Sequence, residues 1–227
     1  MPSKQTDYIR KLSEKLQQNA VPENVAPMKA YMKNRFEFFG LKAPQRRALF
    51  REFFAAEPLP PANELERNVL ALFDLPEREF HYFAIELTGK FKRGWKPETL
   101  ELFEKMILRR SWWDSVDYIK SVCLKDYFLR FPENRHQITQ RWIDSGNIWL
   151  QRLSVIFQLG YRDKTDLELL KRNILQLIDS REFFVQKAIG WALRDYARTD
   201  PVFVRRFVSE HDLKPLSRRE ALKHSGR

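Results

Sequence analysis

Cysteine, glycine and long apolar runs are all scarce in this sequence of 227 residues. The single cysteine, Cys123, excludes a disulfide framework and argues against a cysteine-based zinc site. The four histidines lie far apart and do not form the HExxH pair of a metalloprotease. A metal site is therefore not expected.

Several further patterns are missing, and each absence excludes a class of protein. No apolar run approaches the roughly 18–20 residues that span a bilayer. The polar segment 1–15 lacks the apolar block of a signal peptide. There is no P-loop, GxSxG or Rossmann fingerprint, which argues against nucleotide hydrolysis and dinucleotide redox chemistry. We expect a soluble cytoplasmic protein without a membrane partner.

Positive charge, in contrast, is abundant. Lys and Arg number 41 against 30 Asp and Glu, which gives a formal net charge of +11. Such an excess indicates a polyanionic partner, most often nucleic acid and sometimes an anionic membrane surface. The alternative is a basic protein that has no such partner.

The chain has a helical pattern throughout. Short turn signals rich in Pro, Gly and Asn are each followed by a segment of helical period, and several of these segments begin with Pro and Glu. Strand-like alternation is missing. The sequence predicts an all-α protein of about a dozen helices.

The helical segments also repeat. Residues 149–153 and 184–188 both read aromatic, apolar, Gln, basic, apolar, and they lie 35 positions apart. Trp113 precedes Trp149 by 36 residues, and Phe80 precedes Trp113 by 33. A period of this size predicts an α-solenoid of HEAT-like repeats with a concave basic face, formed by a single domain over residues 1–227. A plain helical bundle is the alternative.

The segment 111–117 contains a carboxylate beside a large aromatic side chain. Ser111 and Asp114 have the spacing of a capping box, which predicts a helix start. In that helix Trp113 and Asp117 are neighbours at i and i+4, away from the apolar face. The alternative is a tryptophan that packs between repeats and an aspartate in an ordinary ion pair.

Two later segments carry cations next to aromatic side chains. Arg152 follows Trp149 by three residues and could bind a phosphate, or else pair with a carboxylate of the neighbouring repeat. A basic stripe with an indole inside it comprises Lys187, Trp191, Arg194 and Arg198. This stripe suits a nucleic-acid surface, and the alternative is a solvated basic face. Gly190 within it could allow the close approach of a backbone or a ligand.

Other candidate phosphate contacts lie near the two ends of the chain. Tyr31 stands among three cations, and Arg47 belongs to a cluster with Lys42, Arg46 and Arg51. The basic tail includes Arg218 and Arg219, and residues 217–220 have the pattern of a second capping box, which predicts a short helix. Each of these cations taken singly could simply be solvated.

The combination indicates a specific chemistry. Repeats would bring Trp113, Arg152 and the Trp191 region onto one surface, where a carboxylate flanked by two indoles would stabilise a developing cation. A purine alkylated on a ring nitrogen already carries positive charge, so its glycosidic bond breaks without acid assistance. An enzyme need only stabilise the sugar cation and position a water molecule.

The residues that carry this combination resemble a known family, the AlkD-type alkylpurine DNA glycosylases, which repair DNA with HEAT-like repeats. The matching stretches lie at residues 31–34, 75–80, 111–117, 147–152 and 186–191. The resemblance implies that Asp117 is the catalytic aspartate and that Trp113 and Trp191 contact the deoxyribose of the lesion. It also implies that Arg152 engages a backbone phosphate and that Tyr31 lines the same cleft.

The same resemblance implies the activity. The family excises 3-methyladenine and 7-methylguanine from duplex DNA without flipping the base, as a step of base excision repair. We expect a monofunctional, monomeric glycosylase that needs no cofactor and leaves an abasic site, because no lysine is assigned a Schiff-base role. Phosphate contacts by Arg47, Lys187, Arg194, Arg218 and Arg219 are inferred from charge placement alone.

Two other functions fit parts of the pattern. A non-catalytic repeat protein that binds DNA structures would use the same basic face, but it would gain nothing from a carboxylate there. A scaffold for an acidic protein partner is the third possibility.

Overall fold

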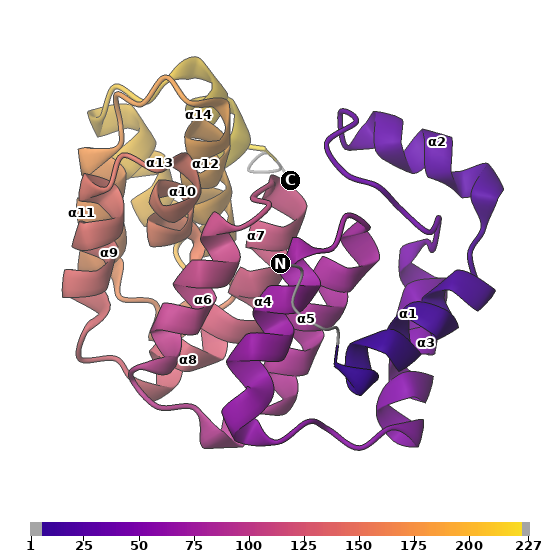
Figure 1. Ribbon diagram of the computed structural model, residues 1–227. Helices are drawn as coiled ribbons and strands as arrows, with labels where there is room; N and C mark the ends of the chain where they lie inside the picture. Colours follow the sequence, from indigo (N-terminus) through magenta and orange to yellow (C-terminus); the bar gives the residue numbers. More distant parts are fainter. Residues whose placement is uncertain (1–5, 224–227) are drawn as a thin grey trace. The chain divides into compact units, whose positions relative to one another are not determined.

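The computed structural model describes residues 6–223, and helices make up its regular elements throughout (Figure 1). An isolated bridge pairs Glu37 with Glu77. None of the helices in this range is long and apolar enough to cross a membrane. The all-α fold class is therefore confirmed. The chain divides into two compact units, Met1–Arg110 and Ser111–Arg227. The single domain over 1–227 stays a prediction.

The first unit is built around a helix that is buried on most of its sides. Its helices are α1 (Asp7–Gln18), α2 (Pro22–Tyr31), α3 (Ala43–Ala56), α4 (Leu65–Asp74), α5 (Arg78–Lys90) and α6 (Thr99–Leu108). At the centre of α5, Phe83 is fully buried. Its ring meets Phe50 and Phe53 edge-on and stacks on Phe54 at 4.7 Å between centroids. These aromatic contacts fix α3 against α5.

Several charged or titratable side chains are also buried in the first unit, and those of Arg78, Glu79 and His81 make hydrogen bonds. Glu79 accepts hydrogen bonds from the backbone N–H groups of Phe39 and Leu41 at 3.2 and 3.1 Å. Arg78 contacts His81 Nδ1 at 3.0 Å and donates to the Arg110 carbonyl at 2.7 Å. Burial without such partners would be costly, so this network is part of the fold.

The second unit is also built of helices. They are α7 (Trp113–Ile119), α8 (Lys125–Arg130), α9 (Arg135–Asp144), α10 (Ile148–Ile156), α11 (Leu167–Gln176), α12 (Phe183–Tyr196), α13 (Pro201–Glu210) and α14 (Pro215–Ala221). A π-helical segment, Lys120–Leu124, joins α7 to α8. Leu153, Ile156 and Phe157 are fully buried at the end of α10. They place α10 at the centre of this unit.

A regular spacing marks the contacts between helix pairs. Hydrogen bonds recur between residues that are 35 or 36 positions apart. These join Arg109 to Asp74, Gln140 to Gln176, Arg152 to Asp117, Gly160 to Asp195, and Lys214 to Asp179. The predicted period of 33–36 residues is therefore a structural repeat, consistent with an α-solenoid. The concave basic face stays a prediction.

Neither predicted capping serine, Ser111 or Ser217, is the N-cap residue of a helix, although a helix starts near each of them. The N-cap residue of α7 is Trp112, whose side chain makes no capping bond. Ser217 lies inside α14, after the N-cap residue Lys214, and its Oγ donates to the Gln186 carbonyl at 3.0 Å. The Ser217 side chain therefore makes a tertiary contact with α12 instead of capping a helix.

Candidate active site

The second unit holds Asp117 and Arg152 in a paired arrangement. Asp117 lies on α7 and Arg152 on the adjacent α10. Arg152 Nε donates to Asp117 Oδ1 at 2.8 Å, and Nη2 donates to Oδ2 at 2.9 Å. The Arg152 side chain is 6% exposed and that of Asp117 20%. This bidentate pair fixes the orientation of the carboxylate and leaves part of it facing solvent.

The arginine is itself held from a third helix. Arg152 Nη1 donates to the carbonyl of Phe184 on α12 at 2.8 Å. The start of α10 is set by Asn147, whose side chain accepts from the N–H groups of Trp149 and Leu150 at 3.0 and 3.3 Å. One guanidinium thus joins α7, α10 and α12. The alternative of a carboxylate partner in the neighbouring repeat is realised, and that carboxylate is Asp117.

An indole from α12 completes the site. The Trp191 ring centroid lies 5.7 Å from Arg152 Cζ and 5.5 Å from Lys120 Nζ, within the range of cation–π attraction. Asp117, Lys120, Arg152 and Trp191 are called the Asp117 cluster below. Three of its members were predicted from sequence, and the structure brings these three together.

Trp113 begins α7, one helical turn before Asp117, and its side chain is half-buried. Its neighbour Trp112 takes part in the aromatic packing between helices in this region. The Trp112 ring meets those of Trp149 and Phe184 edge-on at 5.7 and 5.2 Å between centroids. Trp112 thus packs between repeats, and the contact of Trp113 with the deoxyribose stays a prediction.

Lys120 is the member of the cluster that was not a candidate site residue. The helical pattern places it on the same polar side as Asp117, but it is only 7% exposed. It starts the π-helical segment Lys120–Leu124, and such segments frequently occur at functional sites. Burial lowers the pKa of Lys120, while the nearby carboxylates of Asp117 and Asp195 act in the opposite direction. Its position three residues after Asp117 was the available signal.

The basic stripe on α12 is paired with a carboxylate of α14. Glu220, which is 8% exposed, accepts from Lys187 Nζ at 2.9 Å and from Arg194 Nη1 at 2.7 Å. These bonds lower the pKa of Glu220 to about 2. Arg198 is exposed. Phosphate binding by Lys187 and Arg194 stays a prediction, and in this structure both have a protein partner.

The close approach expected at Gly190 is an approach of backbone. A Cβ atom added there would lie 2.4 Å from Glu220 Cβ and 2.7 Å from the Ser217 carbonyl oxygen. Only glycine allows α14 to pack this tightly on α12, next to Trp191. A glycine in the middle of a helix lowers the stability of that helix, and the close packing of α14 explains why Gly190 is present.

The remaining candidate contacts stay predictions. Tyr31 ends α2 and is 69% exposed, at the edge of a shallow apolar hollow of about 190 Å³. Arg47 is exposed on α3, but Arg46 is buried with its guanidinium 3.9 Å from the Tyr82 ring centroid. In the tail, Arg219 is exposed and Arg218 donates to the His211 carbonyl at 3.3 Å. Arg46 is thus better placed for packing than for phosphate.

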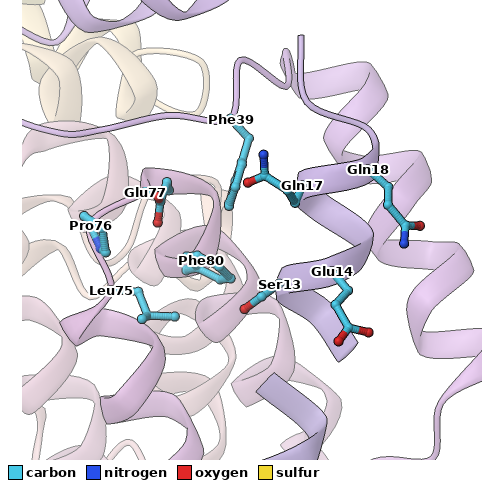
Figure 2. A pocket seen from close by; sticks show the side chains of 9 residues that line it. All are labelled: Ser13, Glu14, Gln17, Gln18, Phe39, Leu75, Pro76, Glu77 and Phe80. Carbon is cyan, nitrogen blue, oxygen red and sulfur yellow. The ribbon is translucent and has the colours of Figure 1, made fainter. Parts of the chain in front are cut away.

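A larger open pocket of about 530 Å³ lies in the first unit (Figure 2). Figure 2 shows side chains of α1 on one side and residues 75–80 on the other, with Phe39 between them. Its charged lining residues, Glu14 and Glu77, are both acidic, so the pocket does not suit a phosphate. Among residues 6–223 there is no group of three or more His, Cys, Asp or Glu residues that could hold a metal ion.

These observations define a helical-repeat protein with a charged and aromatic site built across successive repeats. The chain belongs to the family of DNA alkylation repair enzymes, whose model matches residues 12–225. It is also similar to the solved structure of a predicted DNA alkylation repair enzyme from Enterococcus faecalis. That likeness has a TM-score of 0.84 and 33% sequence identity, and it covers 91% of this chain and 96% of the other. A search of curated proteins found no match. Family membership indicates an enzyme with a role in DNA repair.

Proposed function

We propose that the protein is a DNA glycosylase that hydrolyses the N-glycosidic bond of cationic alkylpurines in double-stranded DNA. The substrates would include 3-methyladenine and 7-methylguanine, and the first product would be an abasic site that enters base excision repair. The observation that carries the proposal is the Asp117 carboxylate held by Arg152, whose Cζ atom lies 5.7 Å from the Trp191 ring centroid. The family match and the net charge of +11 support it.

The chemistry of the substrate explains why one carboxylate suffices. When the bond between C1′ and the purine nitrogen breaks, its electron pair neutralises the charge on the purine ring. Positive charge then develops on the deoxyribose. The exposed part of the Asp117 carboxylate would stabilise that charge and accept a hydrogen bond from the attacking water. No general acid is needed for such a leaving group.

The other members of the cluster would position the sugar. The faces of Trp113 and Trp191 would border the deoxyribose and attract its developing charge. Arg152 uses three of its five N–H groups on Asp117 and Phe184, which leaves two for a phosphate oxygen. Contacts to sugar and phosphate would let the enzyme act without flipping the base into a pocket. A monomer would be sufficient, because the cluster lies within one unit of one chain.

The test is the release of 7-methylguanine from methylated duplex DNA by wild type and Asp117→Asn. Removing the charge while keeping the shape should lower the single-turnover rate by roughly 100- to 1,000-fold, a typical loss for an electrostatic group in a transition state. Binding to undamaged duplex DNA should change little. Asp163→Asn, on an exposed turn, is the matched control and should keep the wild-type rate.

Two outcomes would contradict the proposal. Equal release by wild type and Asp117→Asn would remove the carboxylate from the reaction. Salt-dependent DNA binding by wild type with no base release would instead favour a non-catalytic DNA-binding protein.

A further inference from the structure

Lys120 makes a contact with Trp191 to which the proposed chemistry gives no role. Its Nζ lies 5.5 Å from the Trp191 ring centroid, and the residue is only 7% exposed. Nζ makes no ion pair or hydrogen bond with any residue between 6 and 223. An ammonium group with so little exposure and no acceptor is costly, and the electron-rich face of an indole reduces that cost. Burial lowers the pKa of Lys120, whereas the carboxylates of Asp117 and Asp195 oppose that shift and favour the cation.

The segment that carries Lys120 is anchored in the core of the second unit. Its neighbours Ile119, Cys123 and Leu124 are fully buried. Across the wide turn of the π-helical segment, the N–H of Lys125 donates to the Lys120 carbonyl. Such turns frequently occur at functional sites. The Lys120 side chain therefore reaches the indole of α12 from a well-anchored backbone.

Two other features support Trp191, and neither of them acts on its ring alone. The packing of α14 on Gly190 constrains the backbone next to Trp191. Arg152 lies with its Cζ atom 5.7 Å from the ring centroid, but its guanidinium is already bonded to acceptors on α7 and α12. The Lys120 ammonium has no such acceptor, so its contact with the indole is the one that depends on where the ring lies.

We propose that Lys120 is a positioning residue, which holds the Trp191 ring in the orientation that borders the deoxyribose of the lesion. This inference rests on the proposed function for the position of the sugar. Lys120 acts through the ring and does not touch the substrate. Its charge repels the positive charge that develops on the sugar, so the gain from orienting the ring must outweigh that repulsion. Removal of the cation should therefore slow base release.

The test is the single-turnover release of 7-methylguanine from methylated duplex DNA, with enzyme in excess. Lys120→Met keeps an unbranched side chain but removes the charge, and it should lower the rate by about 2- to 30-fold, the range that a cation–π contact supports. Lys120→Arg keeps a cation and should recover most of that loss. Lys125→Met removes a positive charge five residues along, and as the matched control it should keep the wild-type rate.

Two measurements separate positioning from a merely structural role. In a Trp191→Leu background, Lys120→Met should cause no further loss of rate, because the ring on which it acts is gone. In protein with isotope-labelled tryptophan and without DNA, the indole N–H resonance of Trp191 should shift in Lys120→Met but not in Lys125→Met. The Trp191→Leu spectrum assigns that resonance, and thermal unfolding shows that each variant is folded.

Four outcomes would overturn the role of Lys120 while base release by wild type stands. A folded Lys120→Met could be as fast as wild type or faster, or a folded Lys120→Arg as slow as Lys120→Met. The fold loss from Lys120→Met could be the same with and without the Trp191 ring, or the Trp191 resonance could stay unshifted. No release of 7-methylguanine by wild type would instead remove the proposed function, and the role of Lys120 with it.

Discussion

The two units of the chain both bury charged side chains, but they satisfy them differently. In the first unit, the Glu79 carboxylate accepts from backbone N–H groups and is fully buried. In the second unit, the Asp117 carboxylate accepts from the Arg152 side chain and stays partly open to solvent. A buried charge saturated by backbone groups serves the fold, whereas one held by side chains with an open face is equipped for chemistry. Burial alone does not distinguish the structural carboxylate Glu79 from the candidate site carboxylate Asp117.

The strongest way to break this comparison is a matched pair of amides, Glu79→Gln and Asp117→Asn. Glu79→Gln should lower the free energy of unfolding by about 2–3 kcal/mol, because an amide cannot accept from both backbone N–H groups with both of its heavy atoms. The rate of base release per folded molecule of Glu79→Gln should stay at the wild-type value. Denaturant unfolding measures the free energy of unfolding, and single-turnover assays normalised to folded protein measure the rate of base release. The comparison fails if Glu79→Gln slows base release as much as Asp117→Asn does.

A smaller effect is expected where α12 and α14 touch. Gly190→Ala places a Cβ atom within 2.4 Å of Glu220 Cβ, so α14 must shift. The net cost should be about 1–2 kcal/mol, since overpacking outweighs the gain in helix propensity. Because Trp191 is the next residue, base release should slow as well. Gly94→Ala, where an added Cβ meets nothing within 4 Å, is the control for thermal unfolding and for rate. A stable and fully active Gly190→Ala would show that α14 does not need this close packing.

A third effect is a pH dependence of stability. The pKa of Glu220 falls from 4.5 to about 2 on folding, so this carboxylate stabilises the native state above pH 4.5 and loses that contribution as the pH falls toward 2. Glu220→Gln should therefore be less stable than wild type by a constant amount between pH 5 and 7. The gap should close between pH 4.5 and 2. Exposed Glu133→Gln should show no such gap. A gap that persists at pH 2 would assign the effect to packing instead of charge.

Much of the fold and three cluster residues could be predicted from sequence, because they depend on periodicity. The 35-residue spacing of Asp117 and Arg152 is visible in the chain and becomes a hydrogen bond in the structure. The errors concern contacts that no local pattern encodes. Lys120 is buried beside Trp191 of another helix, and Glu220 neutralises cations of α12. Ser217 fits a cap by its neighbours but bonds to Gln186. Such pairings are decided by which helices pack together.

The spacing of the Asp117–Arg152 bond has a last consequence. Its two residues come from consecutive modules, so neither module possesses the site by itself. Local unfolding of either module would abolish the proposed reaction before the whole chain unfolds. Amide exchange in α7 and α10 should accordingly mark the lowest-energy route to inactivation. A protein from which one of these two repeats is deleted would keep its other helices but lose the Asp117–Arg152 pair and the proposed activity.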